Sequence, residues 1–174
     1  MATYTLISSV TVGSGGAASI DFTSIPATYT DLNLVFSLRS TSDAGGSAAY
    51  DYAYLQINND ETNFSFRQLF VENSSTVNSN SGTGVLYPWA NSNLSTSSTF
   101  SSSLIYIPNY AGSNNKSLSL DTVIENNSAT KNLLVMTAGL WASSSAITSL
   151  KLVAKASNTF VQYSTAYLYG ISNA

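Results

Sequence analysis

The chain has no histidine and no cysteine among its 174 residues. Histidine is the commonest general base near neutral pH and a frequent metal ligand, and cysteine supplies thiolate nucleophiles, thiolate metal ligands and disulfides. Their absence excludes serine-histidine and cysteine-histidine catalysis, disulfide frameworks and thiolate metal centres. It also suits a protein that folds in a reducing cytoplasm, and we expect neither a cofactor nor a metal.

Charged residues are scarce as well. They make up 9% of the chain, and six basic residues leave a net charge of −3, whereas about 25% charged residues is usual. Without a basic patch, neither nucleic acid nor an anionic membrane is an expected partner. No apolar run approaches the roughly 18 residues of a membrane span, and the first residues lack the basic and apolar segments of a secretion signal, so we expect no signal peptide.

Serine, threonine and asparagine take the place of charge and account for 67 of the 174 residues. They are interleaved with apolar residues along the whole chain, which argues against disorder. Hydrophobic residues amount to 44%, enough for a two-layer core in a chain of this length. We therefore expect one domain over residues 1–174, with a neutral polar surface.

Alternation of apolar and polar residues recurs along the chain, and no convincing helical period appears. It is clearest where Leu32, Leu34 and Phe36 point to one side of a strand. Strands are predicted over residues 4–12, 19–22, 31–39, 50–57, 64–71, 99–107, 116–125, 132–141, 146–155 and 160–171. We expect the strands at 50–57 and 64–71 to form a hairpin, and the last two to form a terminal pair.

This spacing of strands without helical crossovers predicts an all-β protein with a β-sandwich fold. We expect a jelly roll of about eight to ten antiparallel strands. An up-and-down barrel is the competing architecture, because the periodicity of the strands is the same in both. Residues 73–98 are the least regular part, rich in Ser, Asn and Gly, and loops of such length are often functional.

A pair of carboxylates is the remaining option for catalysis, since glycoside hydrolysis needs only Asp and Glu. The candidates are Asp51, Asp60, Glu61, Glu72, Asp121 and Glu125. None has a distinguishing local context, and solvated carboxylates on turns and strands explain them more simply. The run from Asn58 to Glu61 lacks the alternating spacing of an EF-hand calcium loop. We therefore expect that the protein is not an enzyme.

Aromatic side chains are the best candidates for an interface. Two stripes are predicted at period two, and Trp89 follows Pro88 in the irregular region as a candidate exposed anchor. Tyrosine and tryptophan are enriched at protein interfaces and stack on sugar rings, whereas the simpler interpretation places both stripes in the core. The candidate interface residues are Tyr50, Tyr52, Tyr54, Trp89, Tyr163, Tyr167 and Tyr169.

Several segments carry a resemblance to a known group. Residues 19–39, the segment Ile107-Pro-Asn-Tyr-Ala111, residues 146–152 and the segment Gln162-Tyr-Ser-Thr-Ala-Tyr-Leu-Tyr-Gly-Ile171 span nearly the whole chain in order. They resemble small virion structural proteins of tailed bacteriophages, a group similar to capsid decoration (cement) proteins and to β-rich modules of tail or head fibres. The resemblance implies a non-catalytic particle component, and no binding residue is carried over from it.

The resemblance implies a location and partners. A decoration protein would be made in the host bacterial cytoplasm and bind the outer capsid surface of the virion. Its partners would be the major capsid protein and copies of itself, as a homotrimer, and it would stabilise the shell by bridging capsomers. The alternative is a tail- or head-fibre module that binds a host-surface receptor or glycan.

Overall fold

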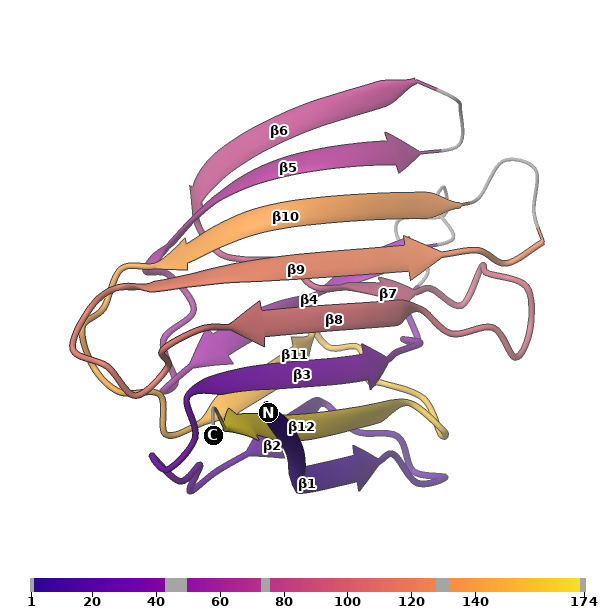
Figure 1. The fold of residues 1–174 in the computed structure, drawn as a ribbon. Helices are drawn as coiled ribbons and strands as arrows, with labels where there is room; N and C mark the ends of the chain where they lie inside the picture. Colours follow the sequence, from indigo (N-terminus) through magenta and orange to yellow (C-terminus); the bar gives the residue numbers. More distant parts are fainter. Residues whose placement is uncertain (1, 43–49, 73–75, 128–131, 173–174) are drawn as a thin grey trace.

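The fold is a sandwich of two antiparallel β-sheets, seen in a computed structural model that describes residues 2–42, 50–72, 76–127 and 132–172 (Figure 1). The described residues contain no helix. The large sheet has the order β1 (Thr3–Thr11), β12 (Thr165–Ser172), β3 (Asp31–Ser37), β8 (Ser102–Ile107), β9 (Lys116–Ile124), β10 (Leu133–Trp141), β5 (Phe64–Glu72) and β6 (Val77–Gly84). The small sheet has the order β2 (Ser19–Phe22), β11 (Leu150–Ala154), β4 (Tyr50–Ile57) and β7 (Trp89–Asn91).

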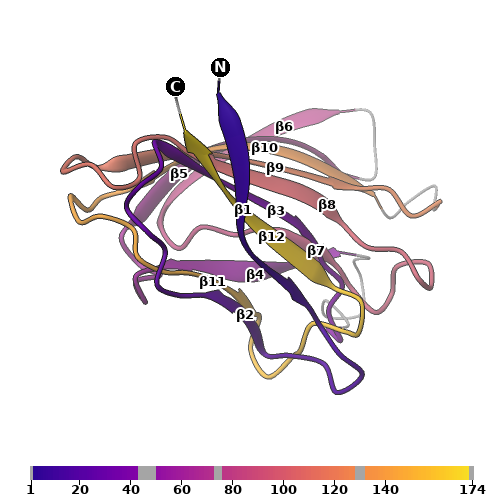
Figure 2. The ribbon, with the colours of Figure 1, turned by 60° about the horizontal axis from the view of Figure 1, so that its bottom comes forward.

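The two sheets lie face to face as separate layers in Figure 2, and a continuous apolar core fills the space between them. The small sheet contributes residues such as Ile20, Leu55 and Leu152, each at most 1% exposed. The large sheet contributes Leu34 and Leu168, equally buried. Burying one such side chain contributes about 1.5–3 kcal/mol, so the alternating pattern of each strand sets which face turns inward.

The prediction of an all-β sandwich is confirmed, and the strands pair antiparallel throughout the two sheets. The more specific jelly-roll topology stays a prediction. Of the twelve strands in the described residues, ten lie where the alternation predicts them. The two that the pattern missed, β6 and β7, fall in the stretch interpreted as an irregular loop, although β6 pairs with β5 over eight consecutive residues.

Both predicted strand pairs are wrong. Strand β4 belongs to the small sheet and β5 to the large one, so residues 58–63 cross between the layers instead of closing a hairpin. The same holds at the end of the chain, where β11 pairs with β2 and β4 while β12 pairs with β1 and β3. Each crossing lets consecutive strands bury their apolar faces against each other across the core rather than side by side.

The chain ends meet at one edge of the large sheet. Strand β1 pairs with β12 over most of its length, with a register shift between Leu6 and Ser8, and the N- and C-termini therefore lie close together (Figure 1). Because β12 also pairs with β3, the last strand is built into the sheet on both sides.

Candidate functional site

Four of the predicted aromatic residues come together on the small sheet. Trp89 of β7 lies opposite Tyr52 of β4, with their ring centroids 5.9 Å apart, and Tyr50 lies 5.6 Å from Trp89. Tyr87, which the sequence interpretation missed, closes the group at 4.7 Å from Tyr52 and 6.0 Å from Tyr54. We call Tyr50, Tyr52, Tyr54, Tyr87 and Trp89 the aromatic cluster.

The aromatic cluster is half-buried and acts mainly as packing. Tyr50 and Trp89 pack against a second, smaller core formed by residues of β9 and β10. Burial, followed by the hydrogen bond and the charge of Glu72, raises the pKa of Tyr50 far above its ordinary value. The indole nitrogen of Trp89 is itself buried, so Trp89 is not the exposed anchor that its position after Pro88 suggested.

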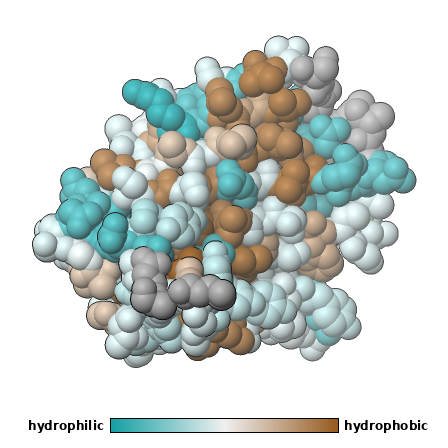
Figure 3. Space-filling view, viewed as in Figure 1, coloured by the Kyte–Doolittle hydropathy of each residue, from teal (hydrophilic) through white to brown (hydrophobic). Residues whose placement is uncertain are grey.

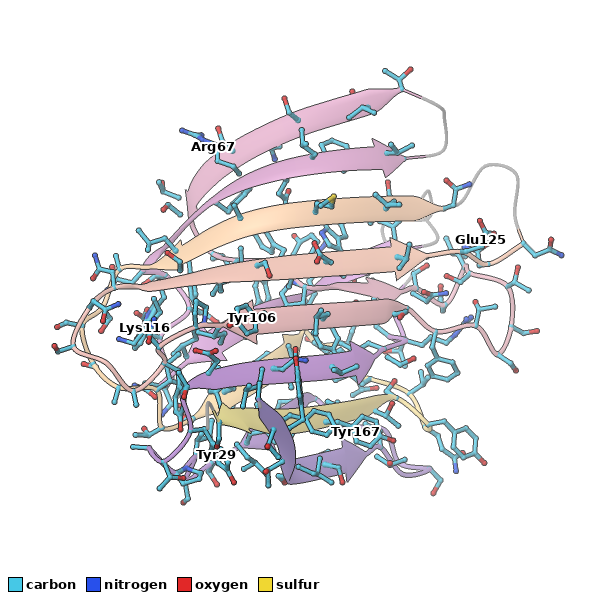
Figure 4. The ribbon with its side chains drawn as sticks, viewed as in Figure 1. Tyr29, Arg67, Tyr106, Lys116, Glu125 and Tyr167 are labelled. Carbon is cyan, nitrogen blue, oxygen red and sulfur yellow. The ribbon has the colours of Figure 1, made fainter. Side chains whose placement is uncertain are left out.

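The tyrosines near the C-terminus lie elsewhere, on the outer face of the large sheet. Tyr167 is directly opposite Val35 of β3, and Tyr169 is directly opposite Leu6 of β1. The ring of Tyr4 lies 6.4 Å from that of Tyr169. We call Tyr4, Leu6, Val35, Tyr167 and Tyr169 the tyrosine band, which occupies the half of the face that Tyr167 marks in Figure 4.

The tyrosine band is unusually exposed for apolar side chains. Tyr4 is 60% exposed, Leu6 50%, Val35 38% and Tyr167 37%. Figure 3 shows that hydrophobic residues also gather on the same face over β5, β10 and β9, beyond the tyrosine band, where Leu69, Leu134 and Met136 are exposed. Tyr163 is even more exposed but lies in the turn before β12, not on the strand. An exposed apolar patch such as the tyrosine band often marks a surface that binds another protein.

The other half of the same face holds a groove of about 880 Å3, formed by β8, β9, β10, β5 and β6. Its floor and walls include one row of outward residues, each opposite the next across the strands: Tyr106, Ser119, Ala138, Arg67 and Ser81. Strands lie about 4.8 Å apart, so the backbones of Tyr106 and Arg67 are about 14 Å apart. The small side chains of Ser119 and Ala138, between the large side chains of Tyr106 and Arg67, leave a depression in this face of the sheet.

The bulky ends of the groove are visible in Figure 4, with Arg67 on β5 and Tyr106 on β8 and two strands between them. A second hollow of about 430 Å3 shares Arg67, Ser81 and Ala138 and extends the groove along the sheet. This site could not be predicted from the sequence, because nothing in the sequence indicates that Ser119 of β9 and Ala138 of β10 lie opposite each other.

The carboxylates considered for catalysis are spread over the molecule. Asp60 accepts hydrogen bonds from Trp141 Nε1 at 2.8 Å and from the main-chain nitrogen of Thr62 at 3.0 Å. Glu61 accepts one from Gln56 Nε2 at 2.8 Å, while Asp121 lines the groove. Asp51 is buried at 3% exposure and lies 3.5 Å from the ammonium of a lysine.

Glu72 belongs to β5, and Glu125 follows β9. In the part of the chain that the structure describes, no three acidic side chains gather in a group that could hold a metal ion. The same part contains no helix long and apolar enough to cross a membrane.

Comparisons of the chain with known proteins found no significant match. No family model matches it, and neither the curated proteins nor the solved structures include one that is significantly similar.

Proposed function

We propose that the protein is a non-catalytic structural component of a tailed-bacteriophage virion, and specifically a capsid decoration protein that docks through the tyrosine band. The observation that carries the proposal is the exposure of four side chains, Tyr4, Leu6, Val35 and Tyr167, beside the half-buried Tyr169 on one half of the large sheet. Aromatic residues are enriched in the buried centre of protein interfaces and charged residues are depleted there. The tyrosine band has that composition.

The chemistry of the chain supports a non-catalytic role. A carboxyl that acts as a general acid needs a raised pKa, whereas the hydrogen bonds to Asp60 outweigh its burial and lower its pKa. Low charge and a surface rich in neutral polar groups suit a protein packed against a shell and its own copies. The resemblance to phage structural proteins is the basis for assigning the protein to a virion and for the homotrimer, and the spacing of the strands is the basis for the jelly-roll topology.

In this role the protein would bind the outer surface of the shell and bridge neighbouring capsomers. A patch of about 800 Å2 on each partner suffices for a stable contact. The tyrosine band supplies the apolar centre of such a patch, and the neutral Ser and Thr residues of β1 and β12 supply its rim.

The test is reconstitution on capsid shells that lack the protein. Wild-type protein should bind the shells at many equivalent sites and raise their thermal stability. V35S and Y167S, which remove exposed side chains from the tyrosine band, should bind weakly. V123S is the matched control, because Val123 is also exposed on the same face, at 47%, but lies outside the band. If wild-type protein neither binds nor stabilises the shells, the decoration role is wrong.

The second candidate function is a tail- or head-fibre module that binds a host-surface receptor or glycan, and the groove between Tyr106 and Arg67 is the observation that favours it. Location on the particle separates the two candidates. Cryo-electron microscopy of intact virions would show hundreds of copies on the shell for a decoration protein, and a few copies at the tail or vertices for a fibre component.

A further inference from the structure

The groove between Tyr106 and Arg67 concentrates charge in a molecule that has little of it. Arg67 is one of only six basic residues, and it lines the groove together with Asp121. Among the residues that the structure describes, neither side chain has an ion-pair partner. Arg67 offers hydrogen-bond donors in a planar fork and Asp121 offers two acceptor oxygens. Both can therefore bind a ligand without first breaking a contact within the protein.

Tyr106, the aromatic residue at one end of the groove, is fixed by a hydrogen bond to a buried carboxylate outside the groove. The hydroxyl of Tyr106 donates a hydrogen bond to Asp31 Oδ2 at 2.7 Å, and the main-chain nitrogen of Asn109 donates to Asp31 Oδ1 at 2.9 Å. Asp31 is buried at 9% exposure. This anchoring fixes the ring of Tyr106 before any ligand arrives, and binding then costs less conformational entropy.

The floor of the groove limits which ligands fit. It is the face of a sheet in which β8, β9, β10 and β5 each have a partner strand on both sides, so their main-chain groups are already paired. An extended peptide that binds by strand addition needs a free strand edge, which this floor does not offer. Recognition must come from side chains: the exposed apolar side chains of Leu69 and Met136, one aromatic ring, one cation, one carboxylate and several serine hydroxyls.

We propose that this groove is a binding site for a short neutral oligosaccharide. Sugar rings have apolar faces that can pack on Tyr106 and on the exposed apolar side chains of the lining, and they have hydroxyls that donate to Asp121 and accept from Arg67. The volume of about 880 Å3 is within the range of about 300–1,000 Å3 for small-ligand sites, and the adjoining hollow prolongs it. The site goes beyond the decoration role, because no residue that lines it belongs to the tyrosine band.

The experiment titrates the full-length protein with oligosaccharides and follows its amide signals by NMR. The probes are maltotriose, cellotriose, mannotriose and triacetylchitotriose at millimolar concentrations, together with an array of bacterial surface polysaccharides. At least one probe should shift amides of β8, β9, β10 and β5 around the groove. No shift with any probe, or shifts confined to other surfaces, would overturn the assignment.

A matched pair of variants tests the position of the site. S119L fills the floor of the groove, whereas S102L adds the same side chain to an exposed position of β8 outside it. The affinity of the bound probe should fall by about tenfold or more in S119L, and likewise in R67A and D121N, each of which loses a charged hydrogen-bonding group. S102L should bind as wild type. Equal binding by S119L and S102L would contradict the proposal.

The docking of the tyrosine band on capsid shells and the binding of oligosaccharide in the groove can be tested independently of each other. S119L should still bind capsid shells if the tyrosine band is the docking surface, and V35S should still bind the oligosaccharide. If instead the groove variants lose shell binding and no sugar binds, the groove belongs to a protein interface and the saccharide assignment is wrong.

Discussion

The guanidinium of Arg39 donates a hydrogen bond from Nη1 to the main-chain oxygen of Thr99 at 3.0 Å, across 60 residues of sequence. The same nitrogen reaches the oxygen of Thr96 at 2.9 Å, while Nη2 reaches those of Asn93 at 3.2 Å and Ser95 at 3.0 Å. One side chain thus satisfies four carbonyl groups of the loop between β7 and β8. Residues 92–98 of this loop belong to the stretch 73–98 that the sequence analysis describes as least regular, and residues 99–101 belong to the strand predicted over 99–107.

Replacing Arg39 should loosen that loop. A lysine presents a single point charge and cannot match four separated carbonyl oxygens, so we expect R39K to lose about 1–3 kcal/mol of unfolding free energy. Urea denaturation measures the loss, and hydrogen exchange of the amides between residues 93 and 101 should accelerate. R67K is the control, because Arg67 is exposed; an equal loss in both variants would show that the carbonyl contacts of Arg39 are unimportant.

Gly170 is a second position where a small change should be costly. It lies in β12, and a Cβ atom added there would collide with the ring of Tyr29. G170A should therefore force Tyr29 or the strand to move and lose about 1–3 kcal/mol. Gly13 provides the control, since an added Cβ meets nothing within 4 Å and its backbone needs no left-handed conformation. Calorimetry should show a lower Tm for G170A and an unchanged one for G13A.

The strands that alternate strictly were predictable, and their partners were not. Buried Leu118 and Leu120 alternate with exposed Ser117 and Ser119. This pattern identifies β9 from its own residues, because one face of the strand is exposed to solvent. Nothing comparable identifies β6, whose Ser and Asn residues are exposed on both faces. It becomes a strand because β5 pairs with it over eight residues.

Sites assembled from several strands were harder to predict. The tyrosines of β4 and β12 were predicted as two stripes at period two. The pattern did not show that β4 belongs to the small sheet and β12 to the large one, which puts the two stripes on different surfaces of the molecule. The groove depends on Tyr106 and Arg67 being separated by two strands, and strand order is a non-local property that periodicity does not encode. Main-chain acceptors, such as those bound by Arg39, also leave no sequence signal.

Lys116 should contribute more to stability than a lysine in a surface ion pair. It is fully buried and donates from Nζ to the main-chain oxygens of Gly112 at 2.8 Å and of Asn114, and its burial lowers its pKa. K116M would leave these turn carbonyls without a donor, at a cost of about 1–3 kcal/mol. K151M removes only the partly exposed ion pair with Asp21 and should cost about 0.5 kcal/mol or less.

The comparison is made by urea denaturation of both variants under the same conditions. Salt provides an independent check: added sodium chloride should shrink the small effect of K151M, because surface ion pairs are screened, and leave the effect of K116M unchanged. Similar losses for the two variants would contradict the assignment of Lys116 as a buried clamp of the turn before β9.

Asp60 should make the free energy of unfolding depend on pH in the acidic range. It accepts hydrogen bonds from Trp141 Nε1 at 2.8 Å and from the main-chain nitrogens of Thr62 at 3.0 Å and Asn63 at 3.3 Å. Burial acts to raise the pKa of Asp60, but these hydrogen bonds outweigh it and lower the pKa below its ordinary value. The crossing between β4 and β5 is therefore tied to β10 by an ionised carboxylate.

Because the folded state binds the proton of Asp60 less tightly than the unfolded state does, its contribution to stability is present above the unfolded pKa of about 3.9. That contribution is lost as the pH falls through the lower folded pKa. D60N should therefore be less stable than wild type at neutral pH, by about 1–2 kcal/mol, and the difference should narrow in acid. Tryptophan fluorescence during urea unfolding at several pH values measures it. A difference for D60N that is constant with pH would mean that the charge of Asp60 is not what holds the crossing.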